Sequence, residues 1–171
     1  MKRITGTNSM RITKNNKTKN VKNTIKTIYL GADHAGFDLK EKVKRWLERK
    51  GIPYGDLGNQ VLNSNDDYPD YAIKVAKRVA KEKTLGVLFC GSAQGMCIAA
   101  NKVKGARAAV PFSIKEARLA REHNDANVIC LSGWYYHFHK ATKLIEAFIN
   151  SEFSKEERHV RRIKKIEKLK I

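Results

Sequence analysis

The chain has 171 residues, of which 42% are hydrophobic and 30% are charged, and its formal net charge is +18. This length and this hydrophobic content are typical of one globular domain and exclude a chain that is disordered throughout. No run of 18 apolar residues occurs and the start has no apolar signal-peptide core, so we expect neither a membrane span nor secretion.

The positive charge is concentrated at the two ends of the chain. Residues 1–26 contain eight Lys or Arg and no acid, and residues 155–170 contain eight against three Glu. The part between them is only mildly basic, so the charge does not predict a specific nucleic-acid role. The first 26 residues hold too few apolar side chains to fold, which predicts a disordered basic tail followed by a domain over 27–171.

Strands and helices are expected to alternate along the domain. Apolar runs predict strands over 27–32, 52–57, 85–89, 106–110 and 127–131. Apolar residues at helical spacing predict six helices. They are a helix that ends at Gly51, one that begins at Tyr68, one after Gly95, and helices over 113–121, 144–149 and 155–170. This alternation predicts an α/β fold, a three-layer αβα Rossmann-like sandwich with a five-stranded parallel sheet.

The last predicted helix has an unusual pattern. Its apolar residues Val160, Ile163, Ile166 and Leu169 are three apart among many charges, which makes a narrow stripe suited to packing on a partner subunit.

The stretch from 87 to 101 is the first candidate for chemistry. An apolar strand ends at Cys90, a Gly91–Gly95 turn follows, and an Ala-rich helix begins. Such a junction directs backbone N–H groups and a helix dipole at one point, which favours bound phosphate, an oxyanion or the Cys90 thiolate. The alternatives are a plain turn and a cysteine that only packs in the core. No dinucleotide fingerprint or G-K-[ST] phosphate loop is present.

The remaining cysteines and histidines indicate the setting. Cys97 and Cys130 are expected in the core. With no C-x-x-C pair and an odd cysteine count, we expect a reducing compartment, the cytoplasm, although the basic tail leaves organelle targeting as an alternative. No zinc-type Cys/His spacing occurs, so no metal is expected.

Three further groups of polar residues are candidates. Asp33 and His34 follow the first strand and, in a doubly wound fold, meet Cys90 at the carboxyl ends of the strands. The pair His123 and Asn124 precedes the fifth strand and needs a different geometry, such as a second subunit, to join them. Arg158 and Arg162, four residues apart, form either a phosphate clamp or part of a solvated basic helix.

Several motifs together resemble the type B ribose-5-phosphate isomerase family, which includes galactose-6-phosphate and allose-6-phosphate isomerases. They are Gly31-Ala32-Asp33-His34-Ala35-Gly36, Asp67-Tyr68-Pro69, Cys90-Gly91-Ser92-Ala93-Gln94-Gly95, Ile98-Ala99-Ala100-Asn101-Lys102, Glu122-His123-Asn124-Asp125 and Arg158-His159 with Arg162. The resemblance runs in order from about 27 to 167.

The resemblance implies a metal-independent and cofactor-independent aldose–ketose isomerase of the pentose phosphate pathway. It implies that Cys90 moves the proton between C2 and C1 through a cis-enediolate, that Ser92 assists, and that His123 opens the sugar ring. It assigns substrate binding to Asp33, His34, Tyr68, Gly91, Ser92, Ala93, Gln94, Gly95, Asn124, Arg158 and Arg162. It also implies a homodimer, or a tetramer, with sites shared between subunits.

The chain departs from the family pattern at four places. Trp134 stands where Arg is common, Ala93 where Gly is common, Gln94 is bulkier than usual, and 155–157 is not glycine-rich. From the resemblance we expect ribose 5-phosphate and ribulose 5-phosphate as substrates. The four departures make a six-carbon sugar phosphate the alternative. A non-catalytic phosphate- or nucleic-acid-binding protein is the alternative of another class, and it would not require the thiol and the histidine together.

Overall fold

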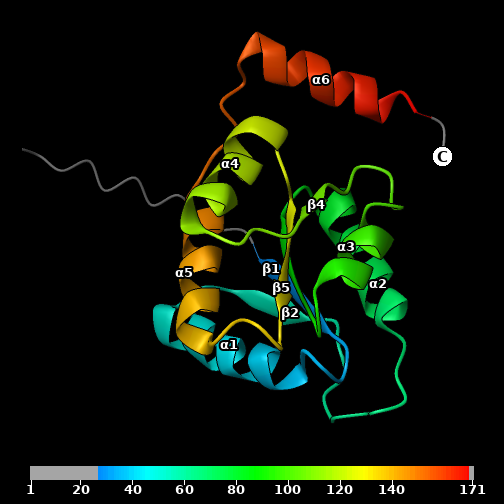
Figure 1. Ribbon diagram of the computed structural model, residues 1–171, viewed down its shortest axis with the longest axis vertical. Coiled ribbons are helices and arrows are strands. Elements are labelled where there is room, and N and C mark those ends of the chain that lie inside the picture. Colours follow the sequence, from blue (N-terminus) through cyan, green and yellow to red (C-terminus); the bar gives the residue numbers. More distant parts are fainter. Residues whose placement is uncertain (1–26, 170–171) are drawn as a thin grey trace, which may run out of the picture.

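Residues 27–169 of the computed structural model form an α/β fold around one parallel sheet (Figure 1). The sheet order is β2-β1-β3-β5-β4. Its strands are β1 (Ile28–Ala32), β2 (Tyr54–Asp56), β3 (Leu85–Cys90), β4 (Ala108–Ala109) and β5 (Val128–Ser132). The helices are α1 (Phe37–Lys50), α2 (Tyr68–Glu82), α3 (Gln94–Ala100), α4 (Ile114–Asn124), α5 (Phe138–Ile149) and α6 (Glu157–Glu167). The predicted basic tail, 1–26, lies outside the described residues.

Helices cover both faces of the sheet, which confirms the predicted three-layer sandwich. One core is shared by the sheet with α1, α4 and α5, and the other by the sheet with α2 and α3 (Figure 1). Side chains alternate along β3: Val87 and Phe89 join the first core, whereas Leu88 and Cys90 join the second. Both faces of a central parallel strand are therefore apolar, as the continuous run 87–90 predicts. None of the helices in 27–169 is long and apolar enough to cross a membrane.

The fourth strand is shorter than the 106–110 predicted from sequence. The side chain of Asn101 takes the place of a neighbouring strand: its Oδ1 accepts from Ala108 N at 2.8 Å, and its Nδ2 donates to Ala108 O at 3.0 Å. The side chain thus satisfies the edge of the sheet at that point, where a further strand could otherwise pair.

The last helix is also shorter than the 155–170 predicted. It begins at Glu157, after a left-handed Lys155, and ends at Glu167. Only His159 of this helix is buried, and Ile166 and Leu169 are 56% and 67% exposed. The apolar stripe is therefore largely uncovered in the single chain, and its packing on a partner subunit stays a prediction.

A buried lysine anchors the loop between β2 and α2. Lys40, in α1, is fully buried, and its Nζ lies 2.5 Å from Asp56 Oδ2 and donates to the Asn59 carbonyl at 2.9 Å. Lys44 reaches the same Asp56 oxygen at 2.9 Å. Burial alone would raise the pKa of Asp56, but hydrogen bonds from Lys40, Lys44 and Gly58 hold the pKa below its usual value.

Removing Lys40 is expected to destabilise the fold strongly. Lys40→Met keeps most of the buried stem and leaves Asp56 with a single cation, which should cost about 3–5 kcal/mol of unfolding free energy. Lys44→Met is the matched control, because Lys44 is partly exposed and its loss leaves Lys40 in place. Urea denaturation of both variants measures the difference, and equal losses would contradict the role of burial.

Candidate active site

The carboxyl ends of β1, β3 and β5 are tied together by short polar contacts. Asp33 N donates to the Phe89 carbonyl at 3.2 Å, and Gly133 N donates to the Cys90 carbonyl at 2.8 Å. The buried Ser132 hydroxyl donates to the Gly91 carbonyl at 2.5 Å. The three loops that follow these strands are thus held as one unit, as expected for a ligand site in a doubly wound sheet.

Two glycines permit this close approach. A Cβ at Gly36 would overlap the Phe89 carbonyl and lie 2.7 Å from Cys90 N, and a Cβ at Gly133 would overlap the Ala35 carbonyl. Backbone therefore packs directly on backbone at both places, which only glycine allows. These contacts set the position of Cys90 relative to the Asp33 loop.

Cys90 ends β3 and is only 7% exposed. Burial, followed by the hydrogen bond to and the charge of Asp33, raises the pKa of its thiol to about 11, although the backbone N–H groups of Ala93 and Met96 act in the opposite direction. The helix start favours the thiolate, as expected from the sequence, but it does not decide the net shift of the pKa in the single chain. The expected N–H groups are present, but desolvation and a carboxylate outweigh them.

The Cys90–Gly95 loop has a strained backbone at Ala93, with a polar residue on each side of it. Ala93 is buried and adopts a left-handed φ of 70°, a conformation that L-residues rarely occupy. Ser92 Oγ accepts from Gln94 N at 3.4 Å, which uses one N–H group at the start of α3. Gln94 is exposed beside it.

Two aromatic rings flank this loop. A Cβ at Gly91 would lie 2.5 Å from the Trp134 ring, and a Cβ at Gly95 would lie 2.7 Å from the Tyr68 ring. Trp134 is 67% exposed and stands edge-on to Tyr135. The loop is therefore bordered by Tyr68 from α2 and by Trp134 from the segment after β5.

His34 joins this end of the sheet with a partner that the sequence analysis missed. Its Nδ1 lies 2.7 Å from Asp66 Oδ1, and its backbone N–H donates to the same oxygen at 3.0 Å. Asp66 belongs to the polar stretch before α2, where several Asn, Ser and Asp residues offer no sequence signal that singles it out.

The second group of predicted residues surrounds two stacked histidines. The rings of His123, in the last turn of α4, and His159, in α6, are 4.3 Å apart and inclined by 12°. Burial, His123 and Arg158 lower the pKa of His159, so its ring stays neutral near pH 7. Arg158 is exposed and bonds Glu156 at 2.8 Å, and Arg162 is exposed one turn further.

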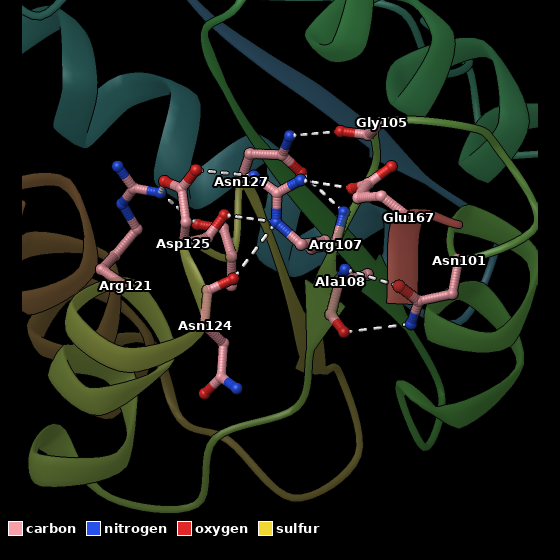
Figure 2. A network of polar contacts seen from close by, with 10 residues as sticks. Asn101, Gly105, Arg107, Ala108, Arg121, Asn124, Asp125, Asn127 and Glu167 are labelled. Atoms are coloured by element: carbon pink, nitrogen blue, oxygen red, sulfur yellow. Dashed lines mark hydrogen bonds and ion pairs between the residues drawn. The ribbon is translucent and has the colours of Figure 1, made fainter. Parts of the chain in front are cut away.

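Arg107 ties this second group to the sheet (Figure 2). Its guanidinium donates to the Asn124 carbonyl at 3.1 Å, to the Asp125 carboxylate at 2.7 Å and to Glu167 at 2.8 Å. The end of α4 and the end of α6 are thereby held by one side chain at the edge strand. The sequence analysis did not single out Arg107 or His159, although the latter lies within a quoted motif.

The two groups lie at opposite ends of the sheet within one chain. Cys90 is level with Ser132 at the carboxyl end of β5, whereas His123 precedes Val128, which begins β5 and pairs with Gly86. Four residues of strand separate these levels, about 13 Å at the rise of a parallel strand. Figure 1 shows α6 beside the end of α4 and far from α1. The single chain therefore brings Asp33, His34, Tyr68 and Cys90–Gly95 together, but not with His123, Asn124, Arg158 and Arg162.

No group of three or more His, Cys, Asp or Glu side chains within 27–169 could hold a metal ion. The polar groups gathered at the carboxyl end of the sheet are instead a thiol, carboxylates, an imidazole and hydroxyls. Such a set can bind an anionic polar ligand and move protons.

Comparison with known proteins points in one direction. The model of the Ribose/Galactose Isomerase family matches residues 28–166. The probable ribose-5-phosphate isomerase B of Mycoplasma genitalium is 44% identical over 81% of this chain and 92% of its own length. The ribose-5-phosphate isomerase B of Mycobacterium tuberculosis strain H37Rv is 43% identical over 80% of this chain and 85% of its own length.

Solved structures agree with these relatives. The ribose 5-phosphate isomerase of Thermotoga maritima matches with a TM-score of 0.80 at 42% identity, over 84% of this chain and 98% of that one. The Mycoplasma genitalium ribose-5-phosphate isomerase B, solved with bound ribulose-5-phosphate, matches with a TM-score of 0.78 at 43% identity. The match covers 82% of this chain and 93% of that one.

The raised pKa of Cys90 predicts slow alkylation of the monomer, which is prepared by dilution and checked by size-exclusion chromatography. The thiolate fraction should rise about tenfold per pH unit through pH 9 without a plateau, because the pKa is about 11. Iodoacetamide labelling followed by peptide mass spectrometry measures this rate at Cys90, with Cys97 and Cys130 as internal references. A plateau at Cys90 below pH 9 would show that the thiolate is stabilised after all.

Proposed function

The chain belongs to the ribose/galactose isomerase family, and from that membership we propose that it interconverts ribose 5-phosphate and ribulose 5-phosphate. The observation that carries the proposal is the match to the Mycoplasma genitalium enzyme with bound ribulose-5-phosphate, 43% identical over 82% of this chain. A non-catalytic binding protein is disfavoured, because simple binding requires neither the thiol nor the histidine of the two groups.

In the proposed reaction Cys90 is the base. It removes the proton from C2 of the open-chain aldose, and the electron pair forms the C1–C2 double bond of the cis-enediolate while the carbonyl electrons move to O1. The O2 hydroxyl proton passes to O1, the C2 carbonyl forms, and the first proton returns to C1 to give the ketose. The N–H groups of the loop from Gly91 to Gly95 stabilise the enediolate oxygen, and Ser92 helps to hold base and substrate. His123 opens the ring by giving a proton to the ring oxygen, while the anomeric hydroxyl loses its proton and becomes the C1 carbonyl.

If Cys90 is the base, its environment calls for a nearby group that lowers the pKa of its thiol. A thiol with a pKa of about 11 is almost wholly protonated at neutral pH. Cations brought near it would lower that pKa. Arg158 and Arg162, exposed on α6, are such cations and also fit the predicted clamp on the substrate phosphate.

We infer that these cations come from a second copy of the chain. Within one chain the two groups are at opposite ends of the sheet, and exposed apolar residues, Ile166 in α6 and Leu169 just after it, lie near the arginines of this helix. A homodimer in which α6 packs on its partner would cover these residues and complete two identical sites. We place this dimer in the cytoplasm, in keeping with three free cysteines.

A six-carbon sugar phosphate is the second candidate substrate. Trp134 borders the Cys90–Gly95 loop, where its flat ring could stack on a longer sugar and where it replaces a common Arg. Rates for ribose 5-phosphate, allose 6-phosphate and galactose 6-phosphate on the purified protein decide between them. We expect ribose 5-phosphate to be fastest, and the absence of turnover with all three would refute the proposed function.

Removal of the base tests the mechanism. Cys90→Ala and Cys90→Ser should each lower kcat at least about 100-fold, the scale of a lost general base. Cys97→Ser is the matched control, because a hydroxyl can keep the hydrogen bonds of Cys97 with Ala108 and Asn101. Circular dichroism should show an unchanged fold in all three, and undiminished turnover in Cys90→Ala would remove Cys90 from its role.

Mixed dimers test the shared site. Chains with Cys90→Ala and chains with His123→Ala, each inactive alone, are co-expressed with different affinity tags and purified as mixed dimers. If each site takes its thiol from one chain and its histidine from the other, one site of two is intact, and about half of the unmodified activity should return. If both residues came from the same chain, every site would be damaged and the mixed dimer would stay inactive.

A further inference from the structure

A buried carboxylate, that of Asp66, hydrogen bonds to the imidazole ring of His34. The His34 side chain, at the carboxyl end of β1, is 45% exposed, whereas the Asp66 side chain is 3% exposed. One oxygen of Asp66 receives both the backbone N–H of His34, at 3.0 Å, and the ring Nδ1, at 2.7 Å. These two bonds fix the ring relative to its own backbone.

The position of Asp66 does not depend on an exposed loop alone. Its second oxygen faces the Asn59 side-chain amide at 3.4 Å, and the Asn59 carbonyl accepts from the fully buried Lys40 at 2.9 Å. Lys40 is itself held by Asp56. A chain of polar contacts therefore runs from the buried Lys40 through Asn59 and Asp66 to His34.

The charges facing His34 are both negative. Asp66 contacts the ring from the segment before α2, and Asp33 lies beside it after β1; Tyr71 of α2 faces Asp66 and is neutral at physiological pH, since burial and Asp66 raise its pKa. The hydrogen bond to Asp66 raises the pKa of His34, desolvation opposes it, and the charge of Asp33 adds to the rise. The doubly protonated ring therefore persists to higher pH than in a free histidine.

We propose that Asp66 is a positioning residue of the sugar-phosphate site: it binds the Nδ1–H of His34 and leaves the Nε2–H to donate to an anionic oxygen of the substrate. Within 27–169 no side chain or backbone group hydrogen bonds to His34 Nε2, so that nitrogen is available. A hydrogen bond between an imidazolium and an oxyanion is stronger than one between neutral groups. This inference rests on the proposed function for the identity of the substrate.

A purely structural role for Asp66 predicts something different. If Asp66 only held its loop against β1, the important contact would be the hydrogen bond from the His34 backbone N–H to the Asp66 side chain. The charge of the carboxylate would then not matter. The isosteric change Asp66→Asn separates the two roles, because the new amide oxygen can still accept from the His34 backbone N–H while the negative charge is lost.

The test compares the unmodified full chain with Asp66→Asn in two measurements. Histidine-ring NMR, with the His34 signal assigned by its loss in His34→Gln, follows the titration of the ring and its response to inorganic phosphate. We expect the titration of His34 to move to lower pH in Asp66→Asn and phosphate to bind more weakly. In the isomerase assay we expect the KM for ribose 5-phosphate to rise about fivefold, with kcat within about twofold.

The sign of the pH dependence follows from the charge. The cation is present below the pKa of His34 and is lost above it, so binding weakens as the pH rises through that value. In the variant, whose His34 pKa is lower, kcat/KM should begin to fall at lower pH than in the unmodified protein. Asp70→Asn removes the same charge from an exposed carboxylate in the first turn of α2, four residues away, and should leave both measurements unchanged.

Two results would overturn the proposal: a His34 titration that Asp66→Asn leaves in place, or a loss confined to kcat with KM unaltered. Thermal unfolding of the variant guards against a general loss of structure. The NMR arm does not require turnover. If the unmodified protein failed to isomerise ribose 5-phosphate while Asp66→Asn still lowered the His34 titration and weakened phosphate binding, the proposed reaction would fall and the Asp66–His34 pairing would stand.

Discussion

The site depends on direct backbone packing at the carboxyl ends of β1, β3 and β5. Gly36 lies against the Phe89–Cys90 peptide, and Gly133 lies against the Ala35 carbonyl, with no room for a side chain at either glycine. The Ser132 hydroxyl at the end of β5 donates to the Gly91 carbonyl and so joins β5 to the loop after β3. Because these contacts join rigid strand ends, the thiol, the imidazole and the loop amides are held in place before any ligand arrives.

This packing has an electrostatic consequence. It buries Cys90 beside Asp33, which raises the pKa of the thiol well above the neutral range. In the single chain the thiol that we propose as the base is thus protonated at neutral pH, while the exposed Arg158 and Arg162 lie at the far end of the sheet. Assembly with a second copy, as proposed, would supply cations at the site and lower the pKa of the thiol only where substrate is held.

Buried charge also supports the loop that holds His34. Lys40 is buried between α1 and the loop before α2, and through Asn59 it helps to hold Asp66 under His34. The attraction within such a buried ion pair is largely offset by the cost of removing both charges from water, whereas loss of one partner leaves the other charge unpaired. The same lysine therefore connects the stability of the fold with the position of Asp66, and Trp134 and Tyr68 border the Cys90–Gly95 loop with aromatic surface.

The sequence alone determined the α/β class, the order of the elements and most of the strands, because apolar runs and helical spacing depend only on local pattern. Its motifs also placed Cys90, His34 and Asp33 at one end of the sheet, since the carboxyl ends of parallel strands must meet there. Local pattern could not show that Asn101 hydrogen bonds to the edge of β4, because that contact joins two segments of different elements. Nor could it show that α6 ends early or that His159 stacks on His123.

The protonation of Cys90 and the partner of His34 were decided only by tertiary structure. The helix start near Cys90 is visible in the sequence and favours the thiolate, but the desolvation that opposes it depends on everything packed around the thiol. Asp66 is one of several acids in a polar stretch, and only the folded loop brings it to 2.7 Å from the His34 ring. Burial and charge act through space, so the pKa of a group follows from the fold and not from its neighbours in the chain.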